Sequence, residues 1–351
     1  MLGATALALA AVTSAIVPPP SAAAAYELTV VFDYTKQGGY VDCPAISGDG
    51  AVAFQRVDVH GNRQVVRGDE DELTVIAKAG QRNIVDFDGV ALNDAGEVAI
   101  VAVLADDEYA VFRGDGSHLD LMATTAGTDL GQIYGDPSID EHGVVAFTAL
   151  RDDYTSGVYT VDKPGGTPRA WYVEDPAIGG VYSADMAGGS IVFRTGGPTF
   201  AAYRSDSPGQ LVRLTDDDET YGDPAITTKK RVALGGYDYN DLVGRIAAGK
   251  RPPLRTYYDS AGSDLDLRSA VTSINQAGTV AFSADYVDDV GSTGVYIGNR
   301  GRPVLQPGDK LGGKTVGSTR FCKDGLNDAG QVAFAVSVVT GTTIIVRANP
   351  T

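Results

Sequence analysis

The residues best suited to bind a ligand recur along the chain as pairs of an aromatic residue and an aspartate. The pairs are Tyr40 with Asp42, Phe87 with Asp88, Tyr134 with Asp136, Tyr182 with Asp185, Tyr221 with Asp223, and Phe321 with Asp324. Aromatic rings stack on sugars or attract cations, and carboxylates accept hydrogen bonds from hydroxyl groups. The pairs therefore predict a ring of binding groups for sugars or cations. The competing interpretation is that every repeat needs them for packing and turn capping.

Three cations break this recurrence. Arg268 stands where other copies have the aromatic residue, and the seventh repeat adds Arg320 and Lys323. Such cations suit a carboxylated sugar, or a lyase in which a tyrosine acts as the base. Ordinary surface ion pairs are the alternative. The candidate ligand-binding residues are Tyr134, Asp136, Tyr182, Tyr221, Asp223, Arg268, Arg320 and Lys323.

Metal and catalytic chemistry have little support in the sequence. Acidic segments at 106–108, 152–153 and 285–289 offer oxygen ligands for Ca²⁺ but lack the alternating spacing of a dedicated loop, so solvated turns are the alternative. The three histidines, His60, His118 and His142, fall in hairpin turns of different repeats. No phosphate, dinucleotide, zinc or serine-nucleophile motif is present. We therefore expect no cofactor and no metal, with Ca²⁺ as the ion to test, and no catalytic residue is identified.

These residues are positioned by a repeated segment whose cleanest copy is PSIDEHGVVAF at 137–147. The seven copies occupy 44–54, 90–100, 137–147, 184–193, 224–234, 273–282 and 325–334. Their penultimate residues, from Ala53 to Ala333, lie 46, 47, 46, 41, 48 and 52 residues apart. A period of this size predicts an array of units that bury their faces against one another.

Each repeat predicts four antiparallel strands. A short first strand ends at the Ile or Leu of the copy, and a turn rich in Asp, Asn and Gly leads into a second, largely apolar strand. Continuous apolar runs are expected where both faces of a sheet are covered. Seven such units predict an all-β, seven-bladed propeller spanning residues 26–351 as one domain. The aromatic and acidic pairs precede the innermost strands, so they would lie at one mouth of the central channel.

The two ends of the chain complement each other. Residues 26–32 resemble 71–77, which is an expected fourth strand, and the last repeat stops after a third strand at 343–347. The N-terminal strand is therefore predicted to complete the last blade, which satisfies otherwise open sheet edges.

Cys43 and Cys322 are the only cysteines, and they occupy near-equivalent places in the first and last repeats. If the array closes into a ring, those repeats are neighbours, and the pair predicts a disulfide in an exported protein. Two buried free thiols are the alternative.

Export is indicated by the first 25 residues, which contain no charge, an apolar run at 2–17 and small residues at 21–25. This pattern predicts a signal peptide cleaved near Ala25 and a secreted protein, although the usual basic residue at the start is absent. The net charge of −17 disfavours nucleic acid and anionic membranes as partners. A glycan or an extracellular protein remains the expected partner, and we expect a monomer.

The chain resembles a group of bacterial exported proteins with tandem Asn-x-x-Gly-x-x-Ala-Phe repeats. The matching copies are 93–100, 275–282 and 327–334, while the copies at 184–193 and 224–234 depart from the pattern. The resemblance implies a β-propeller and export but no particular substrate.

Two functions are compatible with these features. The first is a secreted binding or scaffold module for a glycan or protein, because no catalytic constellation is identifiable. The alternative is an extracellular carbohydrate-active enzyme, a polysaccharide lyase or glycoside hydrolase, with its site at the channel mouth. Fold alone does not separate them.

Overall fold

The computed structural model describes residues 26–34, 43–58, 60–69, 72–197, 200–215, 219–238, 243–287 and 289–351. The expected signal peptide and the pair Tyr40 and Asp42 lie outside these residues, so both stay predictions. Among the described residues no helix is long and apolar enough to cross a membrane.

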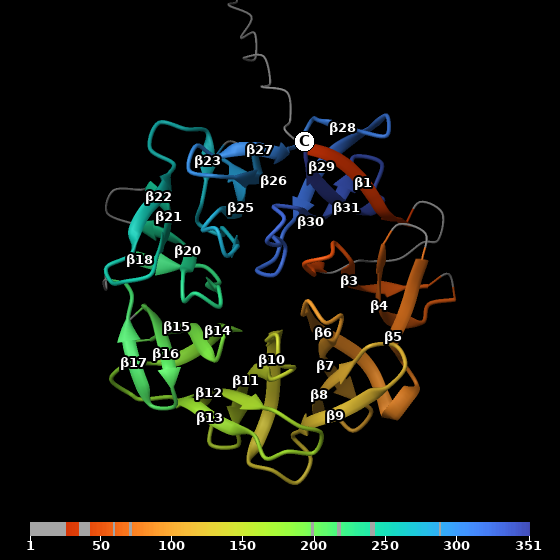
Figure 1. Cartoon of the computed structure of the whole chain (residues 1–351), viewed down its shortest axis with the longest axis vertical. Helices are drawn as coiled ribbons and strands as arrows, with labels where there is room; N and C mark the ends of the chain where they lie inside the picture. The colour runs from red at the N-terminus through yellow and green to blue at the C-terminus, as the bar shows by residue number, and fades with distance from the viewer. Residues whose placement is uncertain are drawn as a thin grey trace, which may run out of the picture.

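Seven antiparallel sheets are arranged around a common axis, which confirms the seven-bladed β-propeller (Figure 1). Blade 1 consists of β2 (Ala45–Ile46), β3 (Val52–Val57), β4 (Arg63–Asp69) and β5 (Glu72–Lys78). Blade 2 consists of β6 (Ile84–Leu92), β7 (Val98–Leu104), β8 (Tyr109–Gly114) and β9 (Leu119–Thr124). Blade 3 consists of β10 (Leu130–Ile139), β11 (Val145–Arg151), β12 (Ser156–Val161) and β13 (Arg169–Val173). A 3₁₀ turn, η2 (Gln81–Asn83), joins the first two blades.

Blade 4 consists of β14 (Gly180–Ala187), β15 (Ser190–Gly196), β16 (Ala202–Ser207) and β17 (Gln210–Arg213). The innermost strands of the next two blades are each in two pieces. Blade 5 contains β18 (Glu219–Tyr221), β19 (Ala225–Ile226), β20 (Val232–Asp238), β21 (Val243–Gly249) and β22 (Arg255–Asp259), and blade 6 contains β23 (Leu265–Asp266), β24 (Thr272–Ile274), β25 (Val280–Tyr286), β26 (Asp289–Ile297) and β27 (Arg302–Leu305).

Blade 7 contains both ends of the described chain. Its sheet order is β1 (Tyr26–Asp33), β31 (Thr343–Pro350), β30 (Val332–Val338) and β29 (Lys314–Arg320), with β28 (Lys310–Leu311) as an added edge strand. The strand β1 runs antiparallel to β31, with Tyr26 opposite Pro350. The prediction that the N-terminal strand completes the last blade is therefore confirmed.

The repeated segment forms the inner hairpin of each blade. The aromatic or aliphatic residue that ends each copy points into the core, and Phe54, Phe147, Phe193, Phe282 and Phe334 are all at most 1% exposed. Blades cover both faces of the second strand, so its apolar residues need not alternate with polar ones. In blades 2, 3 and 4 the innermost strand is longer than expected, because β6, β10 and β14 continue back through the aromatic and acidic pair.

Hydrogen bonds between successive hairpin turns join the blades. The Asn327 side-chain oxygen accepts the N–H of Gln331 in its own turn, and its amide nitrogen donates to the carbonyl of Ser47 in blade 1, at 2.9 Å each. Asn93 likewise donates to the carbonyl of Asp140 in the next blade, at 3.0 Å. The recurring asparagine therefore caps its own turn and connects it to the neighbouring one.

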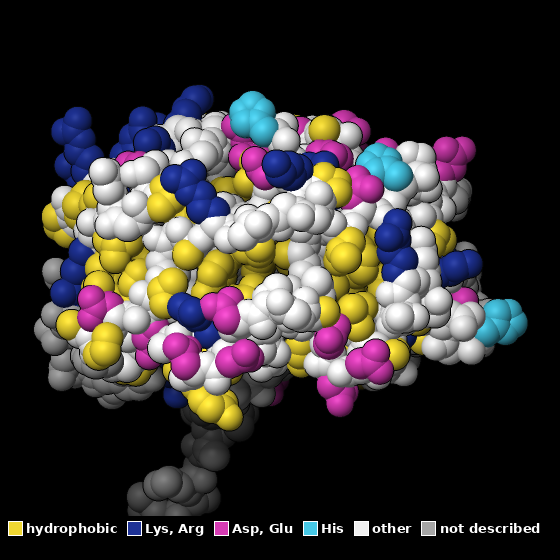
Figure 2. All heavy atoms as spheres, turned by 90° about the horizontal axis from the view of Figure 1, so that it is seen from below, with side chains coloured by type: hydrophobic (Ala, Val, Ile, Leu, Met, Phe, Trp, Pro, Cys, Tyr) yellow, Lys and Arg dark blue, Asp and Glu magenta, His cyan; other side chains and the backbone are white. Residues whose placement is uncertain are grey.

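The ring has two distinct faces. We call the side that carries the inner hairpin turns and the loops between third and fourth strands the turn face. The opposite side, where the chain enters each innermost strand, is the entry face. Figure 2 views the ring edge-on and shows Lys and Arg side chains gathered at one end of one rim, whereas Asp and Glu side chains are spread along both rims.

Candidate functional site

A cavity of about 380 Å³ opens at the axis of the ring on the entry face. We call it the axial pocket. Its lining comes from blades 1, 3, 5, 6 and 7 and includes Cys43, Asp136, Asp223, Ser269, Val271, Ser283, Asp285, Gly291, Thr293, Thr319, Arg320, Phe321, Cys322 and Lys323. The structure therefore brings together Asp136, Asp223, Arg320 and Lys323 of the candidate residues.

Lys323 crosses the axis of the propeller. Its side-chain nitrogen donates hydrogen bonds to the carbonyl oxygen of Ala184 at 2.5 Å and to that of Asp136 at 3.2 Å. Ala184 and Asp136 belong to blades 4 and 3, which lie opposite blade 7 in the ring. Lys323 is only 6% exposed, so its ammonium group serves as an internal tie at the floor of the pocket.

The neighbouring Asp324 lies close to Lys323, Asp185 and Asp136, and we call these four residues the axial cluster. Burial and, to a smaller extent, the negative charges of Asp185 and Asp136 raise the pKa of its carboxyl to about 8, against the opposing effect of Lys323. The carboxylate of Asp185 is held by the hydroxyl of Ser138 at 2.7 Å and the N–H of Ile226 at 2.8 Å. The axis therefore combines one ammonium group with three carboxyl groups, one of which holds its proton at neutral pH.

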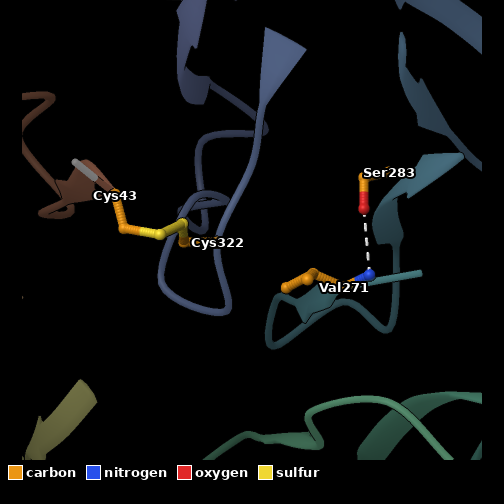
Figure 3. The surroundings of a disulfide bond; sticks show 4 residues. All are labelled: Cys43, Val271, Ser283 and Cys322. Atoms are coloured by element: carbon orange, nitrogen blue, oxygen red, sulfur yellow. Dashed lines mark hydrogen bonds between the residues drawn. A yellow bond between two sulfur atoms is a disulfide. The ribbon is translucent and has the colours of Figure 1, made fainter. Parts of the chain in front are cut away.

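The disulfide between Cys43 and Cys322 forms one wall of the axial pocket. It joins blades 1 and 7, with a Cα–Cα distance of 5.6 Å, which confirms the predicted pairing. Figure 3 shows the bond beside Val271 and Ser283 of blade 6, where the N–H of Val271 donates to the Ser283 hydroxyl oxygen at 2.9 Å. The disulfide therefore fixes the pocket wall at blades 1 and 7, and the hydrogen bond between Val271 and Ser283 fixes the wall at blade 6.

Tyr182 lies at the rim and connects to the pocket through Arg194. The guanidinium carbon of Arg194 sits 5.1 Å from the centre of the Tyr182 ring, and the Arg194 Nε lies 3.3 Å from a carboxylate oxygen of Asp223. The ring of Tyr182 is 56% exposed. An accessible aromatic face is therefore oriented by a cation that is itself held by a pocket carboxylate.

The remaining candidate residues are placed elsewhere. Tyr134 donates its hydroxyl hydrogen to the carbonyl of Val181 in the next blade, at 2.8 Å, as expected of a residue that packs blades together. Arg268 donates through Nε to Asp266 at 2.7 Å and lies over the Tyr237 ring, and it is not part of the pocket lining. Tyr221 ends β18, and only its backbone is described.

Sequence reasoning missed Arg194 and the hydroxyl groups of the axial pocket. Arg194 and Ser283 both follow the last residue of their repeat copies, directly after Phe193 and Phe282. Alignment of the copies at this position would have exposed these polar residues. Thr319 and Ser269 come from segments that vary between blades, and no signal in the sequence marked them.

The described parts of the acidic loops use their carboxylates locally. Within the described ranges, no group of three or more His, Cys, Asp or Glu side chains is placed to hold a metal ion. Asp285 instead accepts the Thr293 hydroxyl at 2.6 Å, and Asp153 accepts the Thr155 hydroxyl at 2.5 Å. Both loops use their carboxylates for local hydrogen bonds.

No protein-family model and no curated protein matches the chain. The fold of the chain does match that of several solved β-propellers. An oligogalacturonate lyase in complex with manganese has a TM-score of 0.63 and 13% identity over 93% of this chain and 96% of that one. An oligogalacturonate lyase from Vibrio parahaemolyticus has a TM-score of 0.60 and 11% identity over 92% and 97%.

A third similar structure is the β-propeller domain of the trilobed protease from Pyrococcus furiosus, which has an open velcro topology. Its TM-score is 0.57, with 9% identity over 89% of this chain and 94% of that domain. At such identities the likeness shows the fold alone, and the proteins compared include both lyases and a protease domain.

Proposed function

We propose that this chain is a secreted binding module that recognises an extracellular glycan at the axial pocket and its Tyr182 rim. One observation carries the proposal: an exposed aromatic ring, oriented by Arg194, stands beside an open pocket whose walls supply hydroxyl and carboxylate groups. Such a combination stacks on one face of a sugar and exchanges hydrogen bonds with its hydroxyls. The disulfide supports export, because such bonds persist in oxidising compartments.

The expected partner is a neutral or weakly acidic sugar chain, and the module acts as a monomer. Asp223 and Asp285 line the pocket, and each carboxylate can accept hydrogen bonds from sugar hydroxyls in addition to the ones it receives from Arg194 and Thr293, while Arg320 adds a cation to the same lining. Lys323 is not counted among the contacts with ligand, because its ammonium group already donates to two carbonyl oxygens.

The test is a glycan array probed with the mature chain, followed by calorimetric titration of any glycan retained. Tyr182→Ala removes the ring and is expected to weaken binding about tenfold, since stacking on an aromatic side chain typically contributes about 1–3 kcal/mol. Tyr154→Ala is the matched control, because Tyr154 is 82% exposed but does not line the pocket. Equal losses in both variants, or no glycan retained, would refute the proposal.

The alternative function is a polysaccharide lyase or glycoside hydrolase acting at the same mouth. Arg320 favours it, because a cation among carboxylates suits a negatively charged sugar or transition state. Chromatography of the retained glycan after incubation separates the two functions. Shortened products that disappear with Arg320→Ala would establish an enzyme, whereas an unchanged glycan supports a binding module.

A further inference from the structure

Although the net charge of the chain is −17, several cationic side chains lie close together on the turn face of blade 5. The strands β20 and β21 pair with Val232 opposite Gly249, so the residues just before β20 and just after β21 lie at the same end of the blade. The exposed cations there are Lys229, Arg231, Lys250, Arg251 and Arg255. We call this group the cationic patch.

These cations have no acidic partner among the residues that the structure describes. None of the five forms an ion pair with a described residue, whereas the neighbouring Lys230 lies 3.2 Å from Asp206. The corresponding turns of blades 1, 2, 3 and 7 each contain a carboxylate, such as Asp94 of blade 2 and Asp328 of blade 7, and those of blades 4 and 6 contain no charge. The turn of blade 5 differs from all of them, because Lys229, Lys230 and Arg231 follow one another there.

A second cavity lies on the same face, between blades 3 and 4. It has a volume of about 710 Å³ and is lined in part by Trp171, Lys163, Arg169 and Asp162. The half-buried indole of Trp171 donates its N–H to the Thr160 hydroxyl at 2.9 Å, which fixes the orientation of the ring. Lys163 and Arg169 are exposed and form no ion pair with any described residue. We call this cavity the indole pocket.

The indole pocket and the cationic patch adjoin each other. Gly189 lines the pocket, and its neighbour Gly188 packs so closely on blade 5 that a Cβ there would lie 2.9 Å from the Cα of Thr228. Thr228 directly precedes Lys229. The Arg204 side chain of blade 4 also donates to the carbonyl of Lys250, at 2.8 Å. A linear ligand could thus contact both regions along a single face.

We propose that the turn face of blades 3 to 5 binds an acidic polysaccharide, with one sugar ring against Trp171 and successive carboxylates on the cationic patch. Stacking requires a ring with an apolar face, and an array of unpaired cations requires a regularly charged polymer. The surface lies on the opposite face from the axial pocket and is independent of the function proposed there.

Other polyanions fit these observations less well. A membrane surface is normally bound with apolar insertion as well as charge, and the exposed large hydrophobic side chains lie away from this part of the turn face. Nucleic acid would be repelled at long range, because the total charge of the protein is strongly negative. Neither class explains an indole held beside two cations.

Trp171 is the only tryptophan in the chain, so its fluorescence reports directly on the indole pocket. Polygalacturonate is the probe, and the same polymer with its carboxyls methyl-esterified is the uncharged control. We expect the acidic polymer to shift or quench the emission saturably in low salt, with an affinity that falls steeply as salt rises. The esterified polymer should bind at least about tenfold more weakly, as expected when the charge contacts are lost.

Charge reversal tests the patch. Lys229→Glu with Lys250→Glu should weaken binding at least about tenfold and flatten the salt dependence, because two charge contacts become repulsive. Lys78→Glu with Lys310→Glu changes the net charge equally at exposed sites outside this surface, and should leave affinity within about twofold. Equal effects of the two double variants would overturn the proposal.

Two further probes separate the alternatives. Phosphatidylglycerol vesicles and double-stranded DNA are titrated under the same conditions. Binding of either probe as tight as that of polygalacturonate would overturn the assignment to a polysaccharide, as would binding of polygalacturonate without any change in Trp171 emission. Weaker binding of both, with the Trp171 signal specific to the sugar polymer, supports it.

Discussion

At the scale of single residues, the axial cluster contains a buried lysine that the repeated fold of the blades does not require. Lys323 reaches from blade 7 to carbonyl oxygens of blades 3 and 4, and no other lysine in the described ranges has a hydrogen bond of this kind. Burial of a charge is costly unless it is paired and hydrogen-bonded. The carboxyl groups around Lys323 therefore offset a cost that its own position creates.

The raised pKa of Asp324 makes a prediction about pH. The folded state keeps this carboxyl protonated up to about pH 8, whereas the unfolded chain releases the proton near the ordinary value of 3.8. Between these values the native state binds more protons, so stability falls as pH rises, by at most about 1.4 kcal/mol per pH unit. We expect urea unfolding to show a shallower decline from pH 5 to pH 8 in Asp324→Asn than in the wild type.

A matched carboxylate provides the control for this measurement. Asp107→Asn removes an exposed carboxylate in the loop between β7 and β8, at a residue with φ of 60°, which asparagine tolerates. Its pH dependence should follow that of the wild type. Parallel curves for Asp324→Asn and the wild type would show that Asp324 does not titrate in this range.

Single side chains were also the part of the site that the sequence predicted least. The recurrence located Tyr134, Tyr182 and Asp223 within their repeats, because a repeat sets register. It did not reveal that Tyr134 turns toward the next blade or that Arg194 connects Tyr182 to Asp223. Such contacts depend on rotamers and on neighbours from other repeats, which the spacing of residues does not encode.

At the scale of elements, the hairpin turns of different blades have the same shape but differ in the residue at the first position, which is asparagine in some blades and aspartate in another. Asn327 uses its carbonyl oxygen within the turn and its amide nitrogen to reach blade 1. Asp140 occupies the same position in blade 3 and accepts the N–H groups of His142 and Val144 at 2.9 Å each, but a carboxylate has no hydrogen to donate. Burial raises the pKa of Asp140, so the charged form is disfavoured there.

Reciprocal substitutions test this account of the turns. Asn327→Asp keeps the acceptor, loses the bond to blade 1 and places a charge beside a carbonyl, so a loss of about 1–2 kcal/mol is expected. Asp140→Asn keeps both local bonds and removes a disfavoured charge, so it should be neutral or stabilising by up to about 1 kcal/mol. Thermal unfolding measures both. Destabilisation by both substitutions to a similar extent would contradict the account.

Secondary structure was predictable at this scale because glycines and apolar runs alternate with the period of the blades. Gly96, Gly143, Gly278 and Gly330 all have φ between 76° and 88°, as the shared turn requires. The extension of β6, β10 and β14 was not predicted. Polar residues in these strands precede a bulge, and local sequence does not distinguish a bulged strand from the loop before it.

At the scale of the whole molecule, the ring is closed twice between blades 7 and 1. The strand β1 completes blade 7, and Phe32 of that strand packs against Phe54 of blade 1, with ring centres 5.7 Å apart. The disulfide closes the same junction near the axis, across 279 residues of sequence. Both closures were predictable, because the register of the copies placed the two cysteines and the two ends in equivalent positions.

Removal of the disulfide gives a prediction at this scale. Cross-links that close long loops restrict the unfolded chain, and a loop of this size gives at most about 5 kcal/mol in the chain-entropy model. Cys43→Ser with Cys322→Ser should therefore lower the unfolding midpoint by roughly 5–10 °C while leaving the circular dichroism spectrum unchanged. The same midpoint in wild type and double variant would show that β1 alone secures the junction.

The pairing of Tyr26 with Pro350 also determines where the molecule can be tethered. Both residues lie at the turn-face end of blade 7, on the outermost pair of strands. Blades 3 and 4, which hold the indole pocket, are across the ring from this edge, as Figure 1 shows. A linker attached at either end would therefore leave the rim at the point farthest from that pocket. A propeller immobilised through such a linker would keep its entry face, with the axial pocket, turned away from the surface.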